Sequence, residues 1–206
     1  MPTLLISGFE PFAGKTFNTS QHVAEALDGQ HLTRDVEIRS VVLPVVRGEA
    51  ITQLLAACTA HNPDTVIMLG EVDNRTSITP ERVALNMEDF RIPDNHGNQP
   101  RDTPIHDHGP AAYFATIPVT AMVEAIVDCG LPAEVSNSAG TFVCNHLFYG
   151  LMRHIHQDND RLRAGFIHLP AILPDETPAD MELSLSGCVD GIRAAATAVY
   201  RHGSCR

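Results

Sequence analysis

The sequence is poor in aromatic and in basic residues. Tryptophan is absent, aromatic residues make up 5%, and 14 lysines and arginines face 25 aspartates and glutamates, for a formal net charge of -11. No run of lysine or arginine interrupts this excess of negative charge. Such a surface repels phosphate backbones and anionic lipid headgroups, so we expect neither nucleic acid nor a membrane as a partner.

Long apolar runs and paired cysteine motifs are also missing. No run approaches the roughly 18 apolar residues that a membrane-spanning helix requires. The early apolar stretch TLLISG has no basic segment before it, so it predicts a buried strand rather than a signal peptide. The cysteines are odd in number and have no CxxC spacing, which predicts reduced thiols in a cytoplasmic protein. They are Cys58, Cys129, Cys144, Cys188 and Cys205.

The remaining composition is that of a globular protein, because 44% of the 206 residues are hydrophobic. We expect one domain, residues 1–206. Strands are predicted at 3–9, 36–46 (interrupted at Pro44), 65–70 and 163–170, with a short strand ending at 135. Helices are predicted at 19–28, 48–64, 119–132, 144–156 and 183–202. This alternation predicts an α/β layered fold with a mainly parallel sheet. The polar, proline-rich segment 71–117 is expected to be a long irregular insertion.

A single cysteine stands between a small-residue loop and an apolar helical run in EVSNSAGTFVCNHLFYGLMRHI (134–155). If the helix begins near Cys144, its free amides would lower the pKa of the thiol and could hold an oxyanion. The alternative is a packed structural cysteine beside Phe142, Val143 and Leu147. Position alone leaves both interpretations open.

A cysteine nucleophile needs a base, and the base needs an orienting group. His168 ends the predicted strand GFIHLP, and ligands bind at the carboxyl ends of parallel strands. Glu81 in ITPERVALN is a candidate orienting carboxylate. A hydrogen-bonded core histidine and a first-turn helix acid after Pro80 are the alternatives. Spacing does not prove that the three side chains meet.

Four segments in order, SGFEPFAG, SITPERVALN, SNSAGTFVCNHLFY and GFIHLP, carry a family resemblance. Over about residues 4–170 the chain resembles the pyroglutamyl peptidase I (pyrrolidone-carboxylate peptidase) family of cysteine peptidases. The resemblance implies a three-layer α/β/α sandwich with a twisted mixed sheet. It also implies a homotetramer that hydrolyses the bond after the N-terminal pyroglutamyl residue of peptides, through a thioester and with no metal or organic cofactor.

The resemblance also implies roles for individual residues. Cys144 is the expected nucleophile, His168 the general base and then acid, and Glu81 the group that orients His168. Arg91 is expected to support the thiolate or oxyanion. The residues expected to line the pocket for the lactam ring are Phe9, Phe12, Asn18, Glu71, Ile92, Phe142 and Val143. Ordinary core packing is the alternative for Phe9 and Phe12.

The chain departs from the family's usual pattern in EVDNR (71–75). Glu71 stands where glutamine is usual, and Asp73 and Asn74 stand where small residues are usual. A carboxylate near the site disfavours a neighbouring thiolate. NTS (18–20) replaces the usual Asn-Pro, and HLPAIL (168–173) carries one extra residue. A binding protein that has lost turnover is therefore the runner-up interpretation.

Two other function classes receive less support. The spaced donor pairs are His106 with His108, His154 with His156, and Cys144 with His146. No further ligand follows at a recognisable spacing, and helical residues at i and i+2 face apart, so we expect no metal. The stretch GFEPFAGKT lacks the GxxxxGK(S/T) spacing of a phosphate-binding loop.

Overall fold

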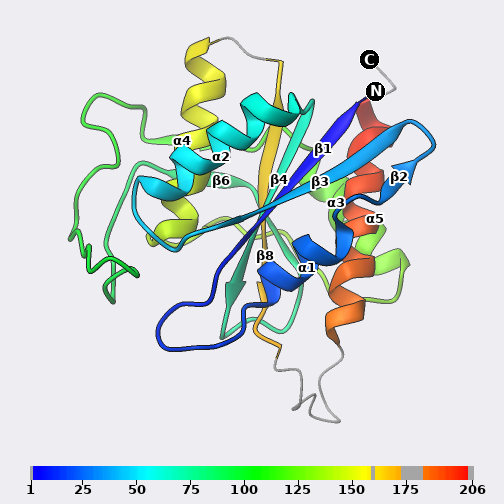
Figure 1. Ribbon diagram of the computed structural model, residues 1–206, viewed down its shortest axis with the longest axis horizontal. Helices are drawn as coiled ribbons and strands as arrows, with labels where there is room; N and C mark the ends of the chain where they lie inside the picture. The colour runs from blue at the N-terminus through cyan, green and yellow to red at the C-terminus, as the bar shows by residue number, and fades with distance from the viewer. Residues whose placement is uncertain (1, 159–160, 173–182, 204–206) are drawn as a thin grey trace.

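A computed structural model describes residues 2–158, 161–172 and 183–203. A six-stranded sheet of order β2-β3-β1-β4-β8-β5 lies between two layers of helices (Figure 1). Its parallel strands are β1 (Thr3–Phe9), β3 (Val36–Leu43), β4 (Thr65–Val72) and β8 (Arg163–Pro170). The edge strands β2 (His31–Thr33) and β5 (Thr79–Glu81) pair antiparallel. The predicted three-layer α/β fold with a mixed, mainly parallel sheet is confirmed.

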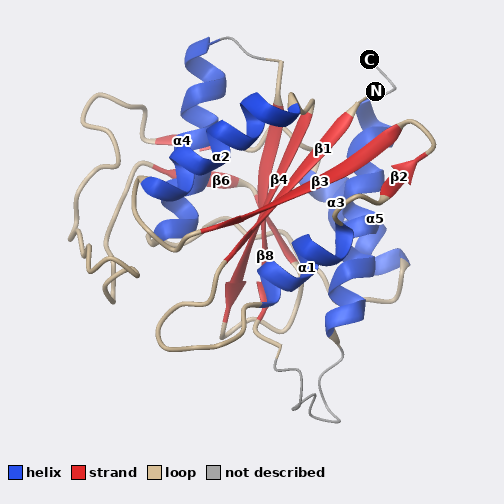
Figure 2. Ribbon diagram, in the orientation of Figure 1, coloured by secondary structure: helices blue, strands red, loops and turns tan. Residues whose placement is uncertain are grey.

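Helices cover both faces of the sheet (Figure 2). One layer holds α1 (Thr19–Leu27), α3 (Val119–Asp128) and α5 (Leu185–Gly203), and the other holds α2 (Glu49–His61) and α4 (Val143–Asp158). Successive side chains of a strand point to opposite faces. Leu4 and Ile6 of β1 therefore join the core under the first layer, and Leu5 joins the core under the second. This explains why the central strands are apolar along their whole length.

Two predictions about local structure are wrong. The segment 71–117 contains β5 and a separate antiparallel pair, β6 (Val83–Leu85) and β7 (Ala112–Phe114). Strands of three residues are too short to show a periodic pattern, so they could not be predicted from the sequence. The strand expected to end at Val135 is instead extended chain with isolated bridges from Ala133 to Ile78 and from Ser136 to Glu81.

The helix ends agree with prediction within a few residues. α2 ends at His61 because Asn62 adopts the left-handed conformation that closes many helices. α4 begins at Val143, one residue before the expected start. Within the described ranges, no helix has the length and apolar character needed to cross a bilayer.

Candidate active site

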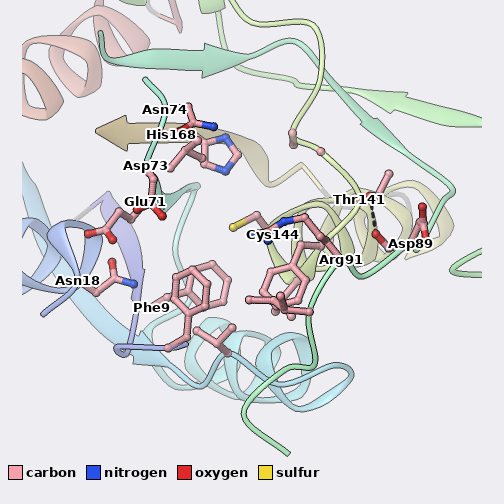
Figure 3. Close-up of a pocket in the computed structure, with 18 residues that line it drawn as sticks. Phe9, Asn18, Glu71, Asp73, Asn74, Asp89, Arg91, Thr141, Cys144 and His168 are labelled. Carbon is pink, nitrogen blue, oxygen red and sulfur yellow. Dashed lines mark hydrogen bonds between the residues drawn. The ribbon is translucent and has the colours of Figure 1, made fainter. Parts of the chain in front are cut away.

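A cavity of about 280 Å³ opens at the carboxyl ends of β1, β4 and β8 (Figure 3). This is the edge where ligands bind in parallel sheets. Cys144 and His168 both line it. Glu81 does not line the cavity. The other residues expected in the site do, namely Phe9, Phe12, Asn18, Glu71, Arg91, Ile92, Phe142 and Val143.

Cys144 lies in the first turn of α4, and its sulfur points into the cavity near the His168 ring (Figure 3). The sulfur also packs against Gly70 of β4, because a Cβ built on Gly70 would lie 2.9 Å from Sγ. Gly70 is the register partner of His168 on the neighbouring strand β8. The missing side chain at Gly70 thus gives the thiol room beside the strand that carries the histidine.

His168 and Glu81 form a buried pair. His168 Nδ1 lies 2.7 Å from Glu81 Oε1, and the two side chains have exposed fractions of 2% and 0%. Burial lowers the pKa of His168 below its ordinary value, although the hydrogen bond to Glu81 acts in the opposite direction. The ring is therefore neutral at neutral pH, with Nδ1 donating to Glu81 and Nε2 left to accept a proton. Glu81 is on β5, so the first-turn helix interpretation is wrong.

Arg75 also contacts Glu81, a role that was not predicted from the sequence. Its Nη1 donates to Glu81 Oε1 at 2.7 Å, while Nη2 donates to Ser136 Oγ and Ser138 O, each at 3.2 Å. Burial acts to raise the pKa of Glu81, but the hydrogen bond from His168 and the charge of Arg75 help to lower it below its ordinary value. The only available signal was that Arg75 stands six positions before Glu81.

The start of the helix acts to lower the pKa of Cys144, as predicted, but burial outweighs it. Burial raises the pKa of this thiol to about 12, and the charges of Glu81 and Glu71 act in the same direction. A backbone hydrogen bond at the helix start and the charge of Arg75 lower it by less. At neutral pH the cavity is therefore lined by a neutral thiol and a neutral imidazole. The cation that favours the thiolate here is Arg75, whereas support from Arg91, which lines the cavity, stays a prediction.

Aromatic rings form one wall of the cavity. The ring centroids of Phe12 and Phe142 are 6.0 Å apart, and Phe90 meets Phe142 edge-on at 4.6 Å. Phe9 is 3% exposed and belongs both to the core and to the cavity lining. The two interpretations of Phe9 are thus compatible.

Asn18 is first of all the N-cap of α1. Its Oδ1 accepts from the Ser20 amide at 3.0 Å and from Ser20 Oγ at 2.7 Å, and its Nδ2 donates to Glu10 O at 3.1 Å. These bonds satisfy a free amide at the helix start. Asn18 also borders the cavity, and its carboxamide carries a second N–H that can serve a ligand.

The spaced histidines make other contacts. His146 Nδ1 lies 2.5 Å from Glu88 Oε1, and its Nε2 accepts from the Gly48 amide at 3.2 Å. His154 pairs with Asp158 at 2.9 Å. In the part of the chain that the structure describes, no three His, Cys, Asp or Glu side chains gather in a way that could hold a metal ion.

The family model described as pyroglutamyl peptidase matches residues 2–202. The chain belongs to the pyroglutamyl peptidase family. The pyrrolidone-carboxylate peptidase of Vibrio vulnificus is 47% identical over 186 residues, which are 90% of this chain and 86% of that protein. The enzyme of the same name from Bacillus licheniformis is 43% identical over 97% of this chain and 93% of its own.

Solved structures give the same result. The crystal structure of Bacillus amyloliquefaciens pyroglutamyl peptidase I superposes with a TM-score of 0.91 at 41% identity, covering 98% of each chain. The pyrrolidone carboxyl peptidase of Thermococcus litoralis also reaches 0.91, at 34% identity over 99% of this chain and 96% of its own. The predicted family and enzyme class, a cysteine-type pyroglutamyl peptidase, are confirmed.

Two predictions concern residues outside the described ranges. Cys205 lies beyond Gly203, and the end of HLPAIL reaches residue 173. The extra residue expected after His168 in this member of the pyroglutamyl peptidase family thus stays a prediction.

Proposed function

We propose that this chain removes the N-terminal pyroglutamyl residue from peptides by thiol catalysis. The observation that carries the proposal is that Cys144 and His168, which is paired with Glu81, line one cavity with an aromatic wall. A pyroglutamyl group is a small uncharged lactam, so it suits an apolar pocket with a few polar groups. The family match supports turnover and does not favour the binding-only alternative.

The first half of the proposed reaction forms a thioester. Because the pKa of Cys144 is raised to about 12, the thiol does not ionise alone at neutral pH. His168 Nε2 takes the thiol proton as sulfur bonds to the pyroglutamyl carbonyl carbon. The first amides of a helix have no partner within it, so those of α4 can hold the oxyanion. The C–N bond then breaks, and His168 returns the proton to the leaving amine.

The second half releases pyroglutamate. Water attacks the thioester carbonyl while His168 removes one of its protons, and the C–S bond breaks. The proton passes to the departing sulfur, which restores the thiol. Glu81 stays ionised and stabilises the imidazolium that forms in each half. These steps require no metal or organic cofactor.

The proposal assigns the lactam to the aromatic wall. Phe9, Phe12 and Phe142 would enclose the ring, and the second N–H of Asn18 and the carboxylate of Glu71 would supply polar contacts. Ile92 and Val143 would complete the apolar lining, and Arg91 would support the developing charge.

The proposal also covers the setting of the enzyme. One peptidase domain, residues 1–206, would act on peptides with N-terminal pyroglutamate and assemble as a homotetramer in the cytoplasm. The thiols of Cys129, Cys144 and Cys188 carry no disulfide, which suits a reducing compartment. Phe114 is 69% exposed and Val127 50% exposed, so apolar surface is available for subunit contacts.

The test is release of a fluorogenic amine from its pyroglutamyl conjugate by reduced protein. We expect turnover by the parent and a loss of about 1,000-fold or more in Cys144→Ser, since a triad nucleophile is removed. Cys129→Ser is the control, because Cys129 is exposed and lies outside the cavity. The matching prolyl conjugate, which lacks the lactam carbonyl, should not be cleaved. A folded, reduced parent without activity would contradict the proposal.

A further inference from the structure

Lys15 is the only lysine in the sequence, and it lies beside the cavity. A tight turn directs it there: the Lys15 amide donates to Phe12 O at 3.0 Å, and Ala13 and Gly14 both have positive φ, 53° and 78°. The ammonium lies 5.8 Å from the centroid of the Phe12 ring and 2.9 Å from Glu71 Oε1. It also contacts Asp73. Lys15 thus joins the loop after β1 to the loop after β4.

Glu71 is a buried carboxylate in the cavity wall. Its side chain is 2% exposed, and it borders the same cavity as Cys144. Glu71 Oε2 accepts from the amide of Thr19, the first residue of α1, at 2.7 Å. A buried carboxylate is costly unless it is paired and hydrogen-bonded. One partner of Glu71 is the N-terminus of α1. Among the residues that the structure describes, Lys15 is the only partner of Glu71 with a full positive charge.

Lys15 keeps its charge in this position. Partial burial acts to lower its pKa, but the hydrogen bonds to Asp73 and Glu71 outweigh burial and raise the pKa above its ordinary value. A third of the side chain is still exposed, at 31%, so solvent and reagents reach it.

We propose that Lys15 is a positioning residue of the active site, whose ammonium neutralises Glu71 in the cavity wall and thereby keeps Cys144 reactive at neutral pH. The inference rests on the proposed function only for the identity of the substrate. The reactivity of the thiol is a property of the chain that can be measured without one.

Several charged groups act on Cys144 or lie at the same cavity. Glu81 and Glu71 raise the pKa of the thiol, and Arg75 lowers it. If Lys15 is removed, the charge of Glu71 acts on the sulfur without its neutralising partner, so deprotonation becomes harder. The other titratable or charged groups at the cavity are His168, Asp73, Asp89 and Arg91.

The first test is alkylation of Cys144 by iodoacetamide across pH, followed by mass spectrometry of the peptide that carries it. Lys15→Met keeps most of the length of the side chain and can still lie on Phe12, but it has no charge. We expect its alkylation rate at pH 7 to fall about three- to tenfold, as the pH dependence moves up by about 0.5 to 1 unit. Arg39→Met is the control. Arg39 pairs with Glu37 at 2.7 Å, and neither residue lines the cavity.

A double variant identifies Glu71 as the group through which Lys15 acts. In Lys15→Met/Glu71→Gln the uncompensated carboxylate is gone, so most of the lost alkylation rate should return. Lys15→Arg should react like the parent. The inference is overturned if Lys15→Met shows the parent's rate and pH dependence, or if the double variant is as slow as Lys15→Met.

Chemical modification tests the same idea on the folded parent and does not depend on a variant that folds. Acetylation of the only lysine removes its charge, whereas reductive methylation keeps it, and both reagents also modify the α-amine. We expect the acetylated protein to alkylate more slowly and the methylated protein to match the parent. Equal rates for the two would also overturn the inference. Loss of pyroglutamyl turnover in the parent would contradict the proposed function and leave these thiol rates interpretable.

Discussion

At the scale of single residues, the catalytic geometry depends on charges that burial would penalise if they were unpaired. Glu81 is completely buried, yet it accepts hydrogen bonds from both His168 and Arg75 at 2.7 Å. The same guanidinium reaches Ser136 and the Ser138 carbonyl, so one side chain fixes the carboxylate and the loop before α4. We therefore expect Arg75 to act on the histidine through Glu81, as a positioning residue of the proposed reaction.

Arg75→Met should shift the pH dependence of kcat/KM upward. The charge of Arg75 lowers the pKa of both His168 and Cys144. Without it, His168 holds its proton to higher pH and the thiol is harder to deprotonate, so both effects move the acidic limb in one direction. We expect kcat/KM at pH 7 to fall about 10- to 100-fold, within the range of general acid–base contributions. The measurement is a kcat/KM profile from pH 5 to 9.

Arg82→Met is the matched control for this experiment. Arg82 is exposed, and its Nη1 donates to Asn137 Oδ1 at 2.6 Å, without contact to Glu81. Its profile should overlay that of the parent. An acidic limb that stays in place in Arg75→Met would show that Arg75 only holds the loop.

At the scale of secondary-structure elements, the sequence predicted what is local and missed what depends on distant contacts. The strand ending near His168 and the helix starting near Cys144 follow from periodicity, which is read from neighbouring residues. The pairing of Gly70 with His168 joins residues almost 100 positions apart, and no local pattern contains it. The net rise in the pKa of Cys144 was not predicted for the same reason, because the helix start is local whereas burial comes from the whole fold.

No sequence signal singles out β5, because a strand of three residues, one of them a proline, is too short to show alternation. Its residue Glu81 is a candidate orienting carboxylate in the sequence, and the family resemblance supports that role, but neither predicts the strand that carries it. The role of Arg75 was not predicted, because its partners Glu81 and Ser136 come together only when β5 pairs with β8.

Gly70→Ala should lower turnover by displacing the sulfur of Cys144, the proposed nucleophile. The new Cβ would lie 2.9 Å from Cys144 Sγ and 2.8 Å from the Phe166 ring, so the sulfur must move. Misplaced reacting atoms cost about 10- to 100-fold in rate. We expect a loss of at least about tenfold in kcat/KM, together with about 1–3 kcal/mol of stability from overpacking. Steady-state kinetics and denaturant unfolding measure the two effects.

Gly165→Ala separates these two effects. Gly165 is also a glycine of the central sheet, and its Cβ would meet Ile117 Cδ1 at 2.3 Å, away from the cavity. It should lose a similar amount of stability and keep its kcat/KM. If Gly70→Ala is as active as Gly165→Ala, the space at Gly70 does not position the thiol.

At the scale of the whole molecule, a second buried network lies next in sequence to residues that line the cavity. Glu88 is fully buried, with Arg47 Nε and Nη2 at 2.8 Å from its Oε2 and His146 Nδ1 at 2.5 Å from its Oε1. The Arg47 amide in turn donates to Asp94 Oδ2 at 2.7 Å. These contacts tie the start of α2 and the first turn of α4 to the loop that brings Arg91 to the cavity. The stability of the site is thus linked to that of the fold.

Glu88 should therefore make the folded protein sensitive to acid. Burial acts to raise the pKa of Glu88, but His146 and Arg47 outweigh it and the pKa is lowered from its ordinary 4.5. A carboxyl with a lowered folded-state pKa contributes stability that is present above its unfolded value and is lost as the pH falls through the folded one. The contribution of Glu88 should accordingly be complete above about pH 4.5 and disappear below it.

Glu88→Gln tests this link between a buried charge and the stability of the molecule. At pH 7 we expect a loss of about 3 kcal/mol in the free energy of unfolding, because Arg47 and His146 lose a buried anionic partner. Between pH 7 and pH 3, thermal melts followed by circular dichroism should show a smaller drop in Tm for the variant than for the parent. Glu124→Gln, at an exposed position of α3, should follow the parent at every pH. Parallel Tm curves for Glu88→Gln and the parent would show that acid acts through other carboxyls, of which Glu81 and Asp94 also have lowered pKa values.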